Sequence, residues 1–91
     1  MFTLVTSSQF KKDAKRYQHD KTAQQIIRRV IDLLLSGKPL PPEYKEHPLI
    51  GNYVGYLECH GRPDLLLIYR RDQENQQIKL YRVGSHSALF K

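Results

Sequence analysis

The side chains best suited to chemistry are three histidines and an aspartate spread over the second half of the chain. They stand in loops or at the ends of predicted strands, and they are His47, His60, Asp64 and His86. Histidine exchanges a proton near neutral pH and is the commonest general acid or base in enzymes. Around one basic cleft, such groups would suit metal-independent acid-base cleavage of RNA, with Lys45 or Arg82 stabilising the charged phosphate of the transition state.

The sequence lacks the known short motifs for nucleotide binding and metal binding. The chain has no P-loop, G-x-G-x-x-G, H-E-x-x-H or C-x-x-C pattern, which argues against motif-encoded nucleotide or metal binding. The four titratable residues could instead ligate zinc, but the sequence lacks a close pair of ligands. We therefore expect neither a metal nor another cofactor. From spacing alone, unconnected surface histidines remain the plainer interpretation.

The stretch HGRPDLLLIY, residues 60–69, predicts the central element of the fold. Its apolar run, residues 65–69, is typical of a strand buried on both faces. Gly61 and Pro63 predict a turn with His60 and Asp64 on either side of it. Alternating residues predict further strands over 53–59 and 77–83, with a hairpin at 71–75. Antiparallel pairing of these strands would bring His60, Asp64 and Val83 together.

The first half of the chain predicts a strand followed by two helices. Residues 2–6 alternate as a short strand, and Phe10, Ala14 and Tyr17 then recur at helical spacing. The other faces of this helix carry Lys11, Lys12, Lys15 and Arg16. Those cations suit docking on RNA phosphates, although an ordinary solvated face fits equally well.

The second helix is the clearest prediction. An unbroken apolar stripe runs over residues 23–35 with helical spacing, Asp20 or Thr22 can cap its start, and Gly37 ends it. The stripe predicts packing on the sheet and no chemistry.

Two irregular segments hold the remaining candidates. Residues 38–52 are rich in proline, so we expect an extended, stiffened loop that presents Lys45 and His47 to a ligand. After the last strand, Gly84 stops the pairing and Ser85 can cap a final helical turn beside His86.

Composition limits the class of protein. The chain has 91 residues, 40% of them hydrophobic, and suits a single domain over residues 1–91. A formal charge of +6 favours polyanionic partners, although a merely soluble basic protein is the alternative. The single Cys59 cannot form an internal disulfide, and no segment reads as a membrane span or signal peptide. We therefore expect a cytoplasmic protein with no membrane partner.

Two runs of residues resemble a known family. PLPPEYKEHPLIGNYVGYLECHGRPDLLLIY, residues 39–69, and RVGSHSALF, residues 82–90, resemble the YafQ branch of the RelE-like toxins of bacterial type II toxin-antitoxin systems. The two helices match this family only in pattern. In the resemblance His47, His60, Asp64 and His86 fall on catalytic positions, and Phe90 falls on a functional C-terminal aromatic. Where such toxins can carry Trp after the Pro-Asp pair, this chain has Leu65, a departure that bears on base stacking there.

The resemblance implies an α+β, RelE-like fold of order β-α-α-β-β-β, with a twisted antiparallel sheet packed against an N-terminal helical hairpin. It also implies a ribosome-dependent mRNA interferase that cuts in the ribosomal A site. We expect a ribose 2′-OH to attack the adjacent phosphate, leaving a 2′,3′-cyclic phosphate and a 5′-OH, with one histidine as base and another as acid.

The partners implied are mRNA, the 70S ribosome and a cognate antitoxin. The toxin-antitoxin complex is expected to be a hetero-oligomer that binds operator DNA through the antitoxin. A gyrase-directed toxin of the ParE kind and a non-catalytic RNA-binding module are the alternatives. Neither requires three histidines and an aspartate at the family's positions, so those residues favour the nuclease.

Overall fold

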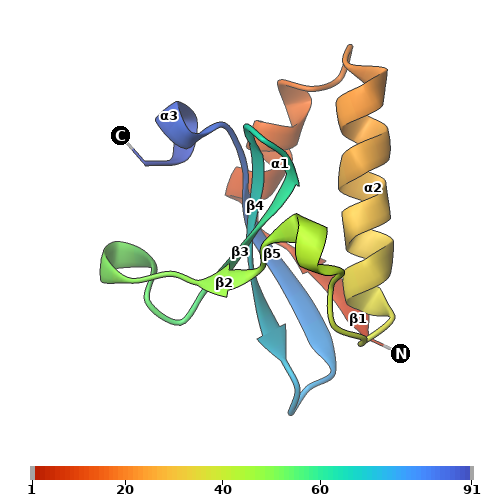
Figure 1. Cartoon of the computed structure of the whole chain (residues 1–91), viewed down its shortest axis with the longest axis vertical. Coiled ribbons are helices and arrows are strands. Elements are labelled where there is room, and N and C mark those ends of the chain that lie inside the picture. Colours follow the sequence, from red (N-terminus) through yellow and green to blue (C-terminus); the bar gives the residue numbers. More distant parts are fainter. Residues whose placement is uncertain (1, 91) are drawn as a thin grey trace.

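The two longer helices cover one face of a five-stranded sheet in the computed structural model, which describes residues 2–90 (Figure 1). The strands are β1 (Thr3–Thr6), β2 (His47–Pro48), β3 (Leu57–Arg62), β4 (Leu65–Asp72) and β5 (Gln77–Gly84). Their order across the sheet is β1-β5-β4-β3-β2. The pairs β3-β4 and β4-β5 are antiparallel, as predicted. The antiparallel pair β2-β3 and the parallel pair β1-β5 add an edge on either side.

The helices are α1 (Ser8–Lys15), α2 (Lys21–Leu35) and the short α3 (His86–Leu89). The Ser7 side chain caps α1 by accepting from the backbone N–H of Phe10, and Asp20 caps α2. The predicted apolar stripe of α2 is confirmed, because Ala23, Ile27, Val30 and Leu34 are buried. No helix within residues 2–90 is long and apolar enough to cross a membrane.

Alternation along β4 divides the protein into two apolar clusters. Leu65, Leu67 and Tyr69 join the core beneath the helices, whereas Leu66 and Ile68 pack with Leu89 on the opposite face. The predicted strand buried on both faces is therefore confirmed, and it forms the rigid base for the second face. We call that second face, on which α3 lies, the open face (Figure 1).

The predicted strand over residues 53–59 was wrong at both ends. Residues Gly51–Tyr53 form a 3-10 turn, and Gly55 has a φ of +92°, a conformation that interrupts a strand. Pairing begins at Leu57 and resumes at Arg62 after a register shift at Gly61, so the turn comes later than predicted. A Cβ on Gly61 would lie 2.6 Å from Cγ2 of Ile26. Gly61 thus permits close packing of α2 on β3 instead of making a turn.

The proline-rich loop is also more regular than predicted. It contains a 3-10 turn at Pro42–Tyr44 and the two-residue strand β2, whose residues His47 and Pro48 pair with Glu58 and Leu57. A strand of two residues is too short to show an alternating pattern in the sequence. Its two backbone pairs nevertheless fix the position of His47.

Candidate active site

The three candidate histidines lie in a row on the open face. Cys59 belongs to the core under the helices, so its neighbours Glu58 and His60 project to the opposite side of β3. The ring centroids of His47 and His60 are 6.0 Å apart, and those of His60 and His86 are 5.9 Å apart. Residues from β2, β3 and α3 therefore meet at one place. The predicted pairing concerned only His60, Asp64 and the end of β5, and it did not include His47.

Glu58 lies beneath two of these histidines and was missed in the sequence. Its Oε1 is 3.2 Å from Nε2 of His47 and 3.5 Å from Nε2 of His60. The residue is only 4% exposed, and its Oε2 has no hydrogen-bond partner within residues 2–90. Alternation along the strand could have placed Glu58 and His60 on one face, but the contact with His47 depends on the register of β2.

The backbone fixes the tautomer of His47. Its Nδ1 lies 2.8 Å from the carbonyl oxygen of Lys45, and a carbonyl only accepts, so Nδ1 carries the proton. A neutral His47 would then turn the lone pair of Nε2 toward the carboxylate of Glu58. The pair is attractive when a proton or a metal cation lies between the two groups. This part of the site is built to hold positive charge.

Asp64 orients His86 at the other end of the row. Its Oδ1 accepts from the backbone N–H of His86 at 3.0 Å and from Nδ1 of the same ring at 3.1 Å. The backbone N–H of His86, followed by its ring, holds the pKa of Asp64 below the ordinary carboxyl value. The His86 side chain is 57% exposed, which leaves Nε2 open to a substrate.

The predicted phosphate-binding residues divide into three groups. Lys45 is exposed and lines a hollow of about 520 Å³ together with His60 and Arg62, so it lies beside the histidine row. The guanidinium of Arg82 is tied to the buried carboxylate of Asp13, with 2.7 Å from Nε to Oδ2. The exposed cations of α1, counted together with its C-cap residue, form no ion pair within residues 2–90 and lie outside the row; they are Lys11, Lys12, Lys15 and Arg16.

Aromatic rings continue the row beyond His86. The Phe90 ring is 6.3 Å from the His86 ring and is 41% exposed. Leu65, in contrast, is 1% exposed and faces the core under the helices, so it presents no surface to a base. Base stacking at that position is thereby excluded for this chain.

A half-buried cluster supports the row from the helix side. The Tyr69 hydroxyl donates to Oε2 of Glu46, and Arg71 donates to the same oxygen from Nε at 3.1 Å and Nη2 at 2.9 Å. Glu46 directly precedes His47, so these bonds hold the start of β2.

Burial raises the pKa of the Cys59 thiol to about 12, so this cysteine is no nucleophile at neutral pH.

His47, Glu58 and His60 also have the character of a metal-ligand set. One ligand atom from each lies within 4.8 Å of the others, and two imidazoles with a carboxylate suit zinc or copper. The unpartnered Oε2 of Glu58 fits such an ion as well as a proton. The expectation that the protein works without a metal stays a prediction.

The arrangement is that of a RelE-like toxin, and comparisons with known proteins confirm this class. The chain matches YafQ in the crystal structure of the E. coli DinJ-YafQ complex with a TM-score of 0.87 and 34% identity over 100% of both chains. It matches the metal-bound toxin from Helicobacter pylori with a TM-score of 0.88 and 40% identity, over 99% of this chain and 100% of that one. The predicted α+β fold is thereby confirmed.

The sequence comparisons identify the family. A family described as bacterial toxin of type II toxin-antitoxin system, YafQ, matches residues 2–91. The mRNA interferase toxin YafQ of E. coli K12 is 36% identical over 85 residues, 92% of this chain and 90% of that relative. The chain therefore belongs to the YafQ family of type II toxins. The predicted enzyme class, an endoribonuclease, is confirmed.

Proposed function

We propose that the protein cleaves mRNA in the ribosomal A site by acid-base chemistry that needs no metal. The observation that carries this proposal is the row of His47, His60 and His86, in which a carboxylate contacts each ring. A carboxylate behind an imidazole orients the ring and stabilises its protonated form. Two such units on one face supply a proton donor and a proton acceptor.

The two units suit the two sides of a phosphodiester. Cleavage requires removal of the 2′-OH proton and protonation of the departing 5′ oxygen, and these oxygens lie on opposite sides of phosphorus. His86 with Asp64 serves one side, and His60 with Glu58 serves the other across 5.9 Å between ring centroids. Lys45, exposed beside His60, offsets the charge of the pentacovalent phosphorane.

Ribosome dependence is supported by charge. The formal net charge is +6, and the exposed cations of α1 lie apart from the histidine row, where they would contact RNA other than the cleaved strand. Contacts to ribosomal RNA phosphates contribute affinity without reading sequence. The specificity of cleavage then comes from the ribosome, which presents the mRNA.

A cognate antitoxin completes the proposed assembly. The E. coli relative was solved in a complex with DinJ, and the positive charge of this chain complements an acidic inhibitor. We further propose that the hetero-oligomer binds operator DNA through the antitoxin and that the toxin acts in the cytoplasm.

A metal ion would compete with this chemistry. The H. pylori relative was solved in a metal-bound form, and His47, Glu58 and His60 would hold zinc or copper here. A metal on Nε2 of either histidine occupies the lone pair that proton transfer needs. We therefore propose that metal binding at these residues inhibits the nuclease.

Mapping of mRNA 5′ ends after induction in cells tests the proposal. Ribosome-phased cuts with 5′-OH ends are expected. A gyrase-directed toxin would instead leave mRNA intact and break DNA, and an RNA-binding module would block translation without new ends. Either of these results would contradict the proposed nuclease.

A further inference from the structure

Arg70 is an exposed cation on the open face, at a distance from the histidine row. Leu66 pairs with His60 across the sheet. Leu66, Ile68 and Arg70 alternate onto the same side of β4, where the two apolar residues are buried. Four residues along a strand span about 13 Å, which separates the backbone of Arg70 from the position opposite His60. A single ligand that reaches both places must be an extended molecule.

The guanidinium of Arg70 is held by stacking and not by an ion pair. Its Cζ lies 5.5 Å from the centroid of the Tyr56 ring. Tyr56 in turn stacks on Tyr81, with 4.9 Å between centroids and 30° between planes. No carboxylate within residues 2–90 pairs with Arg70, whereas Asp13 occupies Arg82. The charge of Arg70 is therefore oriented by the rings and open to a ligand.

Lys79 places a second cation beside Arg70. The two residues pair directly across β4 and β5, an arrangement that is destabilising for like charges. Nζ of Lys79 lies 3.2 Å from Oδ2 of Asp72, which offsets one of the two charges. Both cations line a hollow of about 160 Å³ together with Tyr56 and Tyr81. An anion bound in this hollow would offset the remaining charge.

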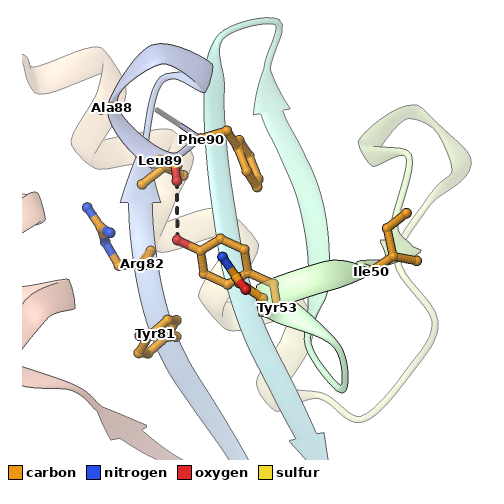
Figure 2. A pocket seen from close by; sticks show the side chains of 8 residues that line it. Ile50, Tyr53, Tyr81, Arg82, Ala88, Leu89 and Phe90 are labelled. Carbon is orange, nitrogen blue, oxygen red and sulfur yellow. Dashed lines mark hydrogen bonds between the residues drawn. The ribbon is translucent and has the colours of Figure 1, made fainter.

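Aromatic rings join this hollow to the histidine row. Tyr53 lies between Tyr81 and Phe90, with ring centroids 6.1 Å and 5.6 Å away (Figure 2). The Tyr53 hydroxyl donates to the carbonyl oxygen of Leu89 at 3.2 Å, which is the dashed line in Figure 2. The Phe90 ring is 6.3 Å from the ring of His86. The surface between the hollow and the row is therefore continuous and preformed.

We propose that Arg70 and Lys79 bind one phosphate of the substrate mRNA, outside the two nucleotides that flank the cut. This inference rests on the proposed nuclease function. The guanidinium fork matches two phosphate oxygens, and the ammonium adds a point charge. A contact about 13 Å along the strand from the chemistry holds the RNA without taking part in the reaction. It contributes affinity and register, and it reads no base.

Binding of a single-stranded 2′-O-methyl oligoribonucleotide tests the phosphate site without cleavage, because the attacking hydroxyl is blocked. Arg70→Gln should weaken binding about threefold to tenfold and reduce the slope of log Kd against log salt by about 0.7, as expected for one phosphate contact on a single strand. Arg70→Lys keeps the charge and should bind within about twofold of the parental protein. Arg28→Gln removes an exposed cation of α2 and should change neither quantity.

Single-turnover cleavage on programmed 70S ribosomes locates the contact. Arg70→Gln should raise the toxin concentration at half-maximal rate about threefold to tenfold and leave the maximal rate unchanged, because the contact is equal in the ground state and the transition state. Replacing one mRNA phosphate at a time by an uncharged methylphosphonate should weaken the parental protein at one position outside the flanking nucleotides. At that position Arg70→Gln should show no further loss.

An unchanged salt slope in Arg70→Gln, or penalties that multiply at every methylphosphonate, would overturn the proposal. Weaker ribosome association with unchanged oligonucleotide binding would assign the two cations to ribosomal RNA, and weaker antitoxin binding alone would assign them to the antitoxin; either result contradicts it. If the parental protein fails to cleave, the nuclease proposal fails, while the salt slope still decides the phosphate site. Should Arg70→Gln fail to fold, Lys79→Gln repeats the test in the same hollow.

Discussion

One carboxylate oxygen of Asp64 accepts from both the backbone N–H and the ring Nδ1 of His86, at 3.0 and 3.1 Å. The two residues are 22 positions apart in the chain, and the contact joins the turn before β4 to the start of α3. The two hydrogen bonds together fix the orientation of the His86 ring. A residue that holds a proton carrier in this way should be sensitive to loss of charge alone.

Asp64→Asn should therefore reduce cleavage roughly tenfold or more, because the amide keeps an acceptor oxygen but no longer stabilises an imidazolium. Single-turnover rates on programmed ribosomes measure the effect. Asp72→Asn is the matched control, since Asp72 also accepts bonds in a turn but lies outside the histidine row. Equal rates for the two variants would show that Asp64 has no part in the reaction.

Chelation should leave the activity intact. If side chains perform the acid-base chemistry, cleavage should persist in EDTA with magnesium controlled to preserve the ribosome. Added zinc or copper should slow the reaction, because His47, Glu58 and His60 lie within ligand distance of one another. Glu58→Gln should weaken zinc binding measured by calorimetry. Strict revival of a chelated enzyme by zinc or manganese would show that the reaction needs the metal.

The buried pair of Asp13 and Arg82 should support stability in a pH-dependent way. Burial raises the pKa of Asp13, but bonds from Arg82, Gln9 and the N–H of Val83 outweigh it and leave the pKa below the ordinary value. Because the folded-state pKa is depressed, the contribution is present above pH about 4 and declines as the pH falls through the folded-state value. Asp13→Asn should cost about 3 kcal/mol at pH 7, as expected for breaking a buried pair.

Urea unfolding at pH 7 and pH 3 measures this difference in the free energy of unfolding. The difference in the free energy of unfolding between the parental protein and Asp13→Asn should be smaller at pH 3 than at pH 7. Asp32→Asn, an exposed change on α2, should be nearly neutral at both values. If this difference between the parental protein and Asp13→Asn is the same at both pH values, packing, and not the ionisation of Asp13, stabilises this region.

Neutralising the exposed cations of α1 should weaken ribosome association and flatten its salt dependence. The four residues, Lys11, Lys12, Lys15 and Arg16, lie off the buried side of the helix, so the fold should survive. A control that neutralises Lys21, Arg28 and Lys38 removes charge elsewhere and should have the smaller effect. Ribosome binding that is unchanged across salt would identify α1 as an ordinary solvated face.

The sequence predicted the parts of the fold that follow one strong periodic pattern. The stripe of α2 and the apolar run of β4 are such patterns, because burial imposes them residue by residue. Asp13 was missed because it stands among lysines, off the predicted apolar stripe of Phe10, Ala14 and Tyr17. Its partner Arg82 lies 69 positions away, a pairing that no local pattern can reveal.

The candidate site was predicted in part for the same reason. His60, Asp64 and His86 stand at the ends of elements whose pairing could be anticipated. The contact of Glu58 with His47 could not be predicted, because it requires a two-residue strand whose register is fixed by tertiary packing. The residue that was missed is therefore the one whose role depends on contacts between segments.

The measurement that tests the central claim most directly is cleavage of mRNA on programmed ribosomes by His86→Gln. Glutamine keeps hydrogen bonding but cannot transfer a proton, and the His86 side chain is 57% exposed, so the melting temperature should stay close to the parental value. Proton transfer by a positioned side chain contributes about 100- to 10,000-fold in rate, and cleavage should fall by that factor. Cleavage by the glutamine variant near the parental rate would show that His86 only positions the RNA, and would contradict the account.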